Sequence, residues 1–97
     1  MPGQSDGVPR LFENRMQAIN AIAKENSEML RLLQRLSGQD VLMMKDPESQ
    51  ETSDEHDAIE AEVAECKTRI DELEAELTRI DEQMEAAAKE EEQHGRE

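Results

Sequence analysis

The chain has 97 residues, of which 37% are charged and only one is aromatic, and its formal net charge is −14. This length allows one small domain, and the scarcity of aromatic rings leaves a thin core of aliphatic side chains. The negative charge is repelled by nucleic-acid phosphates and by anionic membranes, which excludes direct binding to either as the expected function.

The charge is divided unevenly along the chain. Residues 1–46 hold six basic and six acidic residues, whereas residues 47–97 hold five basic and nineteen acidic ones. The second half therefore favours a basic protein partner. Cys66 is the only cysteine, so no internal disulfide is expected. The sequence has neither a long apolar run nor a signal-peptide pattern, and we expect a cytoplasmic protein.

The first predicted elements are a flexible tail over residues 1–8 and a helix over residues 9–37. Gly, Pro and Ser residues are frequent in the tail. Pro9 suits the first turn of a helix, where its missing N–H is not needed. Gly38 suits the C-cap, because glycine tolerates the left-handed conformation found there.

The apolar residues of this first helix form two predicted core lines. They are Phe12, Ile19, Asn26 and Leu33 on one line and Ile22, Met29 and Leu36 on the other. Further apolar residues flank both lines, so the stripe is wider than contact with one helix requires and predicts more than one neighbour. Asn26, within a core line, is interpreted as a residue that fixes register, or alternatively as a residue at the edge of the bundle with its amide in water.

A connection is predicted over residues 38–52. Its unusual feature is the run Val41-Leu42-Met43-Met44, which either closes the end of a helical bundle or forms a docking patch. Thr52 and Glu55 have capping-box spacing. They predict a second helix over residues 53–92, followed by a frayed tail over residues 93–97.

The second helix carries the most regular pattern in the sequence. Apolar residues recur at alternating spacings of four and three, which is the coiled-coil repeat. This predicted seam consists of Ile59, Val63, Cys66, Ile70, Leu73, Leu77, Ile80, Met84 and Ala87.

The two helices can pair in two ways. In an antiparallel hairpin whose facing residue numbers add to about 95, Arg15 lies near Asp81, Glu25 near Arg69 and Glu28 near Lys67. A parallel dimer of the second helix is the alternative, and it aligns two acidic helices along their length. We therefore favour an all-α fold, a two-helix antiparallel coiled-coil hairpin that dimerises into a helical bundle.

Few residues suggest chemistry. Cys66 is explained as a small apolar seam residue, and His56 as a solvated residue of a first helical turn. Glu91 and His94 have the Glu-x-x-His spacing of helical di-iron sites, but they lie at the predicted frayed end. We expect no metal, no cofactor and no catalytic set, and hence no enzyme.

The predicted function is protein–protein interaction, as an adaptor, scaffold or assembly chaperone, and the expected partners are a second copy of the chain and another protein. The candidate contact residues are Leu30, Leu32, Leu33, Val41, Leu42, Met43 and Met44. The alternative is an acidic inhibitor or decoy that binds a basic surface of a nucleic-acid-handling or defence protein.

Overall fold

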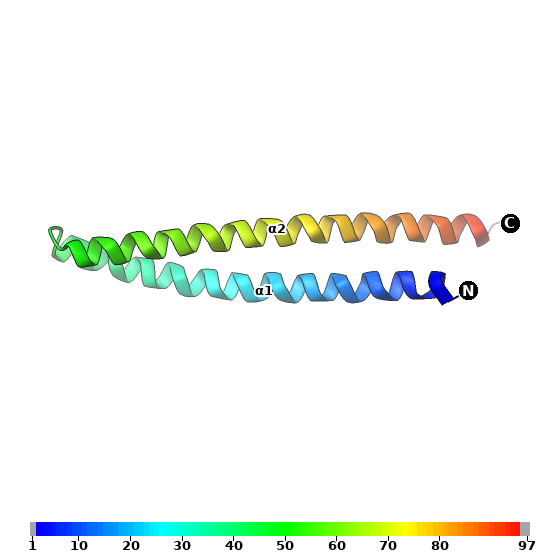
Figure 1. The fold of residues 1–97 in the computed structure, drawn as a ribbon, viewed down its shortest axis with the longest axis horizontal. Coiled ribbons are helices and arrows are strands. Elements are labelled where there is room, and N and C mark those ends of the chain that lie inside the picture. Colours follow the sequence, from blue (N-terminus) through cyan, green and yellow to red (C-terminus); the bar gives the residue numbers. More distant parts are fainter. Residues whose placement is uncertain (1, 96–97) are drawn as a thin grey trace. The chain divides into compact units, whose positions relative to one another are not determined.

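Two long helices joined by a short turn make up the fold (Figure 1). The computed structural model describes residues 2–95. Helix α1 spans Pro2–Lys45 and helix α2 spans Gln50–Gly95. The predicted all-α two-helix hairpin is thus confirmed.

The chain divides into two compact units, each built from one segment of α1 and one segment of α2. The turn unit comprises residues 23–71, and its core consists of Leu32, Ile59 and Cys66, against which Met29, Leu36, Val63 and Ile70 pack. The terminal unit comprises residues 1–22 and 72–97, and Ala18 and Ile80 are buried within it.

The buried face of α2 follows a single heptad line. Between residues 58 and 92, nine residues are buried or half-buried, and every other residue is exposed. These nine are the residues of the predicted seam: Ile59, Val63, Cys66 and Ile70 in the turn unit, and Leu73, Leu77, Ile80, Met84 and Ala87 in the terminal unit. Because the other faces of α2 are largely charged, only the seam can be buried against another helix. The residues predicted from the sequence pattern are therefore the residues that pack.

The buried face of α1 also follows a heptad line, which we call the inner line. Its residues are Val8, Leu11, Arg15, Ala18, Ile22, Glu25, Met29, Leu32, Leu36, Gln39 and Met43, all buried or half-buried. The prediction for Ile22, Met29 and Leu36 agrees with this line. The prediction for the other core line is wrong by one residue, because Leu11, Ala18, Glu25 and Leu32 occupy the positions predicted for Phe12, Ile19, Asn26 and Leu33.

Ion pairs between the helices give the register. Arg15 Nε lies 2.7 Å from Asp81 Oδ1 in the terminal unit. In the turn unit, Arg69 Nε lies 3.1 Å from Glu25 Oε2, and Arg35 Nη1 lies 3.7 Å from Glu62 Oε2. The numbers of each pair add to between 94 and 97, as an antiparallel hairpin requires. The expected pair of Glu28 with Lys67 is wrong, because Glu28 binds Arg31 on its own helix.

The connection is much shorter than predicted, and its caps differ. Asp46 to Ser49 form a turn in which Ser49 N–H donates to the Asp46 carbonyl at 3.2 Å, with Pro47 at the position that favours its fixed φ. Ser49 Oγ then accepts from Thr52 N–H at 3.2 Å, which makes Ser49 the N-cap of α2. The predicted capping box at Thr52 is therefore wrong, as α2 begins at Gln50.

Both helices extend beyond their predicted bounds. Helix α1 begins at Pro2, so residues 2–8 are helical and not a tail, and Pro9 lies inside the helix. The Val41–Met44 run forms the last turns of α1 and is not a loop. Helix α2 continues to Gly95, whereas the predicted end was residue 92. Extending a helix is easier than starting one, because each added residue gains a hydrogen bond while fixing only its own two dihedrals.

Gly38 lies inside α1 rather than at a C-cap, and none of the described glycines has a positive φ. A Cβ built on Gly38 meets no atom within 4 Å. Replacement of Gly38 by alanine is therefore expected to stabilise the protein by about 0.5–1 kcal/mol, because alanine loses less backbone entropy in a helix. Thermal unfolding followed by circular dichroism measures this change. A lower melting temperature would instead favour the left-handed C-cap.

Candidate functional site

An exposed apolar line runs along α1 beside the inner line, and we call it the outer line. Each of its residues directly follows an inner-line residue in the sequence. In the terminal unit it comprises the exposed Phe12 and Met16 and the half-buried Ile19. In the turn unit it comprises Ala23, Asn26, Leu30, Leu33, Ser37, Asp40 and Met44.

The outer line leaves large side chains in contact with solvent. Leu30 is 63% exposed and Phe12 is 54% exposed, and Met16, Leu33 and Met44 are exposed as well. Because single exposed apolar residues are common on protein surfaces, the spacing is the informative feature. A regular series of such residues on one helical face is typical of a surface that packs against another helix.

The structure separates the predicted contact residues into two groups. Leu32 is only 2% exposed and belongs to the core of the turn unit, so it is not available to a partner, and Met43 is half-buried on the inner line. Leu30, Leu33 and Met44 lie on the outer line, whereas Val41 and Leu42 are exposed beside it. Asn26 is exposed on the outer line and does not enter the hairpin core.

A polar cluster takes the place that Asn26 was expected to hold. Glu25 is on the inner line, facing the fully buried Cys66. The Cys66 thiol lies 3.3 Å from both the backbone carbonyl and the Oε2 atom of Glu25, and Arg69 Nε lies 3.1 Å from the same Oε2 atom. The pair of Glu25 with Arg69 was predicted from the sequence and is confirmed, but the contact of Glu25 with Cys66 was missed, because a glutamate was not expected on a core line.

The cluster shifts the acidity of its members. Hydrogen bonds from the Cys66 thiol and from Arg69 hold the pKa of the Glu25 carboxylate below its ordinary value. Burial, together with the nearby Glu25 carboxylate, raises the pKa of the Cys66 thiol. Cys66 is therefore a protonated, shielded thiol at neutral pH, which does not suit a nucleophile.

The lowered pKa of Glu25 predicts a pH dependence. A carboxylate with a depressed folded-state pKa contributes stability that is present above its ordinary pKa of 4.5 and is lost as the pH falls through the lower folded value. Glu25→Gln is therefore expected to reduce the melting temperature at pH 7 by a few degrees, and to reduce it less at about pH 3. The matched control is Glu74→Gln on an exposed position of α2. A constant difference across this pH range would contradict the prediction.

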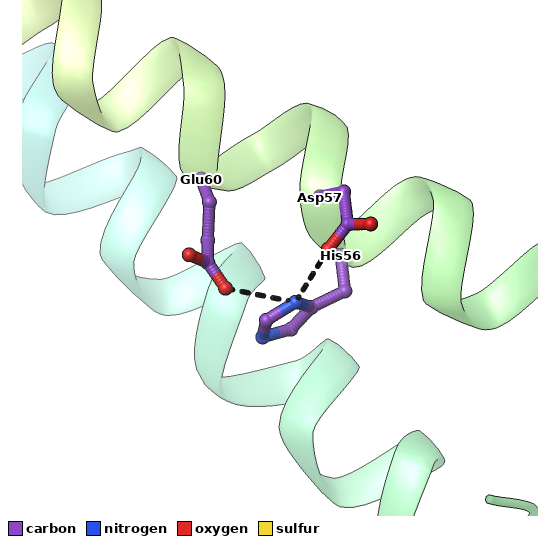
Figure 2. Close-up of side chains that lie close together, drawn as sticks. All are labelled: His56, Asp57 and Glu60. Carbon is purple, nitrogen blue, oxygen red and sulfur yellow. Dashed lines mark ion pairs between the residues drawn. The ribbon is translucent and has the colours of Figure 1, made fainter.

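A second polar cluster surrounds His56 in the turn unit (Figure 2). His56 Nε2 lies 2.9 Å from Asp40 Oδ1 on α1, and Nδ1 lies 3.0 Å from Glu60 Oε1 and 3.6 Å from Asp57 Oδ1 on α2. The imidazole is half-buried and is not the fully solvated residue that was expected. Its position on the α2 line one turn before Ile59 was the sequence signal for this placement.

The His56 cluster can bridge the helices or hold a cation. A doubly protonated imidazolium donates to Asp40 and to Glu60 at once, which links α1 with α2 beside the turn. His56, Asp57 and Glu60 also present three ligand atoms within 4.8 Å of one another, with Asp40 placed to orient the ring. The side chain of His94, in the expected Glu91/His94 spacing, lies outside the described side chains.

A shallow open groove of about 330 Å³ lies in the terminal unit. It arises where the small side chains of Ala18 and Ala21 face α2, and Asn14, Gln17, Leu73 and Glu76 complete its lining. Binding sites for small molecules are usually concave and mostly apolar, with convergent polar groups, and this open groove does not match that description.

No helix in the described residues has the length and apolar character needed to cross a membrane. No protein-family model, curated protein or solved structure matches this chain.

Proposed function

We propose that the chain is a protein–protein interaction module, an adaptor, scaffold or assembly chaperone, that binds other chains through the outer line of α1. The proposal is based on one observation. Large apolar side chains are exposed at heptad spacing and are not part of the hairpin core, namely Phe12, Met16, Leu30 and Leu33. Covering these side chains removes apolar area from water, which is the main favourable term in most protein association.

The contact is one of helix against helix. The alternating spacing of the outer line is the spacing at which side chains of one helix fit between those of another. The protein acts by this contact and not by catalysis, and needs no cofactor. A reducing compartment such as the cytoplasm suits the lone thiol of Cys66, which lies inside the hairpin core.

Paired substitutions on the outer line test this function. Leu30→Glu with Leu33→Glu is expected to abolish co-purification of the native partners from host cells, because each glutamate would be buried without a counter-ion. The matched control, Ala61→Glu with Ala64→Glu, adds the same charge at the same spacing on exposed positions of α2. The control should retain the partners. Unchanged binding by the Leu30/Leu33 variant would rule out the outer line as the binding surface.

The acidic surface of α2 supports a second candidate, an inhibitor or decoy for a basic protein surface. Every acidic residue of α2 between residues 51 and 92 is exposed. Such a contact weakens steeply as salt screens the charges. Replacement of Glu72, Glu76 and Glu82 by glutamine should then weaken binding several-fold at low salt, and intact binding would remove this candidate.

A further inference from the structure

We infer that the outer line packs against the same line of a second copy of this chain, so that the protein dimerises through α1 alone. This inference rests on the proposed function and names its partner. Geometry, charge and an asparagine in the middle of the line support it.

The geometry gives α1 two neighbours. One residue turns an α-helix by about 100°, so the outer line lies about a quarter turn around α1 from the inner line. The inner line packs against α2 within each unit. Apart from Asp40, which contacts His56 of α2, and the half-buried Ile19, the outer line is therefore turned away from α2 and open to another helix. In α2, the residues that directly follow the seam residues include Glu60, Lys67 and Asp71. The seam of α2 therefore has no second apolar line beside it.

A two-fold dimer requires the same surface on both copies. Between residues 58 and 92 all the seam residues of α2 already face the inside of the hairpin, which leaves the outer line of α1 as the apolar face that two copies can share. A closed four-helix bundle needs a second contact face on α2 as well. The inferred dimer is therefore an α1–α1 contact with α2 on its flanks, an open arrangement of the helical bundle expected from the sequence.

Charge favours the same contact. The first 46 residues hold equal numbers of acidic and basic residues, whereas the excess of fourteen negative charges lies in residues 47–97. Contact between two α2 helices would bring these like charges together, but contact between two α1 helices does not. The charged residues that directly follow the outer line on its polar side are one acidic residue, Glu13, and three basic ones, Lys24, Arg31 and Lys45, so this edge carries no acidic excess that would repel a second copy.

Asn26 lies on the outer line between apolar residues of both units. A single asparagine in a helix–helix interface restricts register at a cost in affinity. Its replacement by leucine should therefore tighten the dimer at least tenfold if the outer line is the interface, and should leave the association unchanged if the interface lies elsewhere.

Analytical ultracentrifugation of the purified full-length chain tests the inference. The wild type is expected at twice its monomer mass of 11.0 kDa at about 50 µM protein. Leu30→Glu with Leu33→Glu should sediment as a monomer that keeps the wild-type helical circular dichroism signal, and the Ala61/Ala64 control should remain a dimer.

Two results would overturn the inference. One is a wild type that stays monomeric at this concentration, and the other is a Leu30/Leu33 variant that dimerises as well as the wild type. Failure of the dimer is distinct from failure of the proposed function. If the wild type is found as a monomer while the Leu30/Leu33 variant still loses its native partners, the proposed interaction module stands, but its partner is a different protein and not a second copy of the chain.

Discussion

Replacement of Leu32 by alanine is expected to lower the free energy of unfolding by about 2–5 kcal/mol, because it deletes a fully buried side chain and leaves a cavity. Leu32 is 2% exposed and packs in the turn unit with Ile59 and Cys66. A two-helix core this narrow has few other side chains that can move into the space. Chemical denaturation followed by circular dichroism measures the loss.

The matched control for Leu32→Ala is Leu42→Ala. Leu42 is 48% exposed and lies on neither the inner nor the outer line of α1, so its truncation should change the free energy of unfolding by about 0.5 kcal/mol or less. Similar decreases in the free energy of unfolding of the two variants would contradict the assignment of Leu32 to the buried inner line. Leu33→Ala is a separate comparison. If the outer line is a dimer interface, the decrease in the free energy of unfolding caused by this substitution should depend on protein concentration.

The Cys66 thiol is expected to react with an alkylating reagent at pH 8 at least about a hundredfold more slowly than an exposed thiol, because reaction requires the hairpin to open. The side chain is fully buried, and its raised pKa reduces the thiolate fraction further. The control is Cys66→Ala with Ala64→Cys, which places the single thiol on an exposed position of the same helix. Mass spectrometry over time gives both rates.

The same thiol separates the hairpin from a parallel pair of α2 helices. In a parallel pair, Cys66 lies opposite its own copy and oxidises readily to a disulfide-linked dimer. In the hairpin it faces Glu25 of α1, and Met29 packs against the same core. Mild oxidation is therefore expected to give no disulfide-linked dimer on a non-reducing gel. Such a dimer, or a reaction rate within tenfold of the exposed control, would contradict the hairpin.

The α2 seam was predictable from sequence because every other position there is charged, polar or small. Only the half of the inner line with Ile22, Met29 and Leu36 was predictable in α1, because the two candidates for the other half both contain apolar residues and are offset by one position. Hydropathy favoured the line with Phe12 and Leu33. Packing favours the line with Leu11 and Leu32, because Glu25 on that line finds Arg69 and the Cys66 thiol across the hairpin.

The turn shows why local signals misplaced the helix ends. Gly38 and Thr52 are good caps by residue type, yet both lie inside helices. The heptad lines continue past them, with Gln39 and Met43 on α1 and Thr52 and His56 on α2 all half-buried. Tertiary packing of these residues outweighs the propensity of one glycine, which amounts to about 1 kcal/mol. Ser49 becomes the cap because Pro47 ends the possibility of a continuous helix.

The outer line was visible in the sequence only as an excess of apolar residues on the first helix. Its assignment as a separate surface required the inner line to be known, because each outer-line residue follows an inner-line residue directly. The sequence shows one broad apolar stripe on the first helix. In the structure this stripe consists of two faces of α1, one that packs against α2 and one that is largely exposed.

Site-specific photo-crosslinking in host cells tests most directly whether the outer line binds a protein chain. Benzoylphenylalanine at position 30 is expected to cross-link to a second polypeptide, either another copy of the chain or a different protein. The same probe at position 64 of α2, which is also exposed, should give little product. Equal yields at the two positions, or no cross-link from position 30, would contradict binding through the outer line.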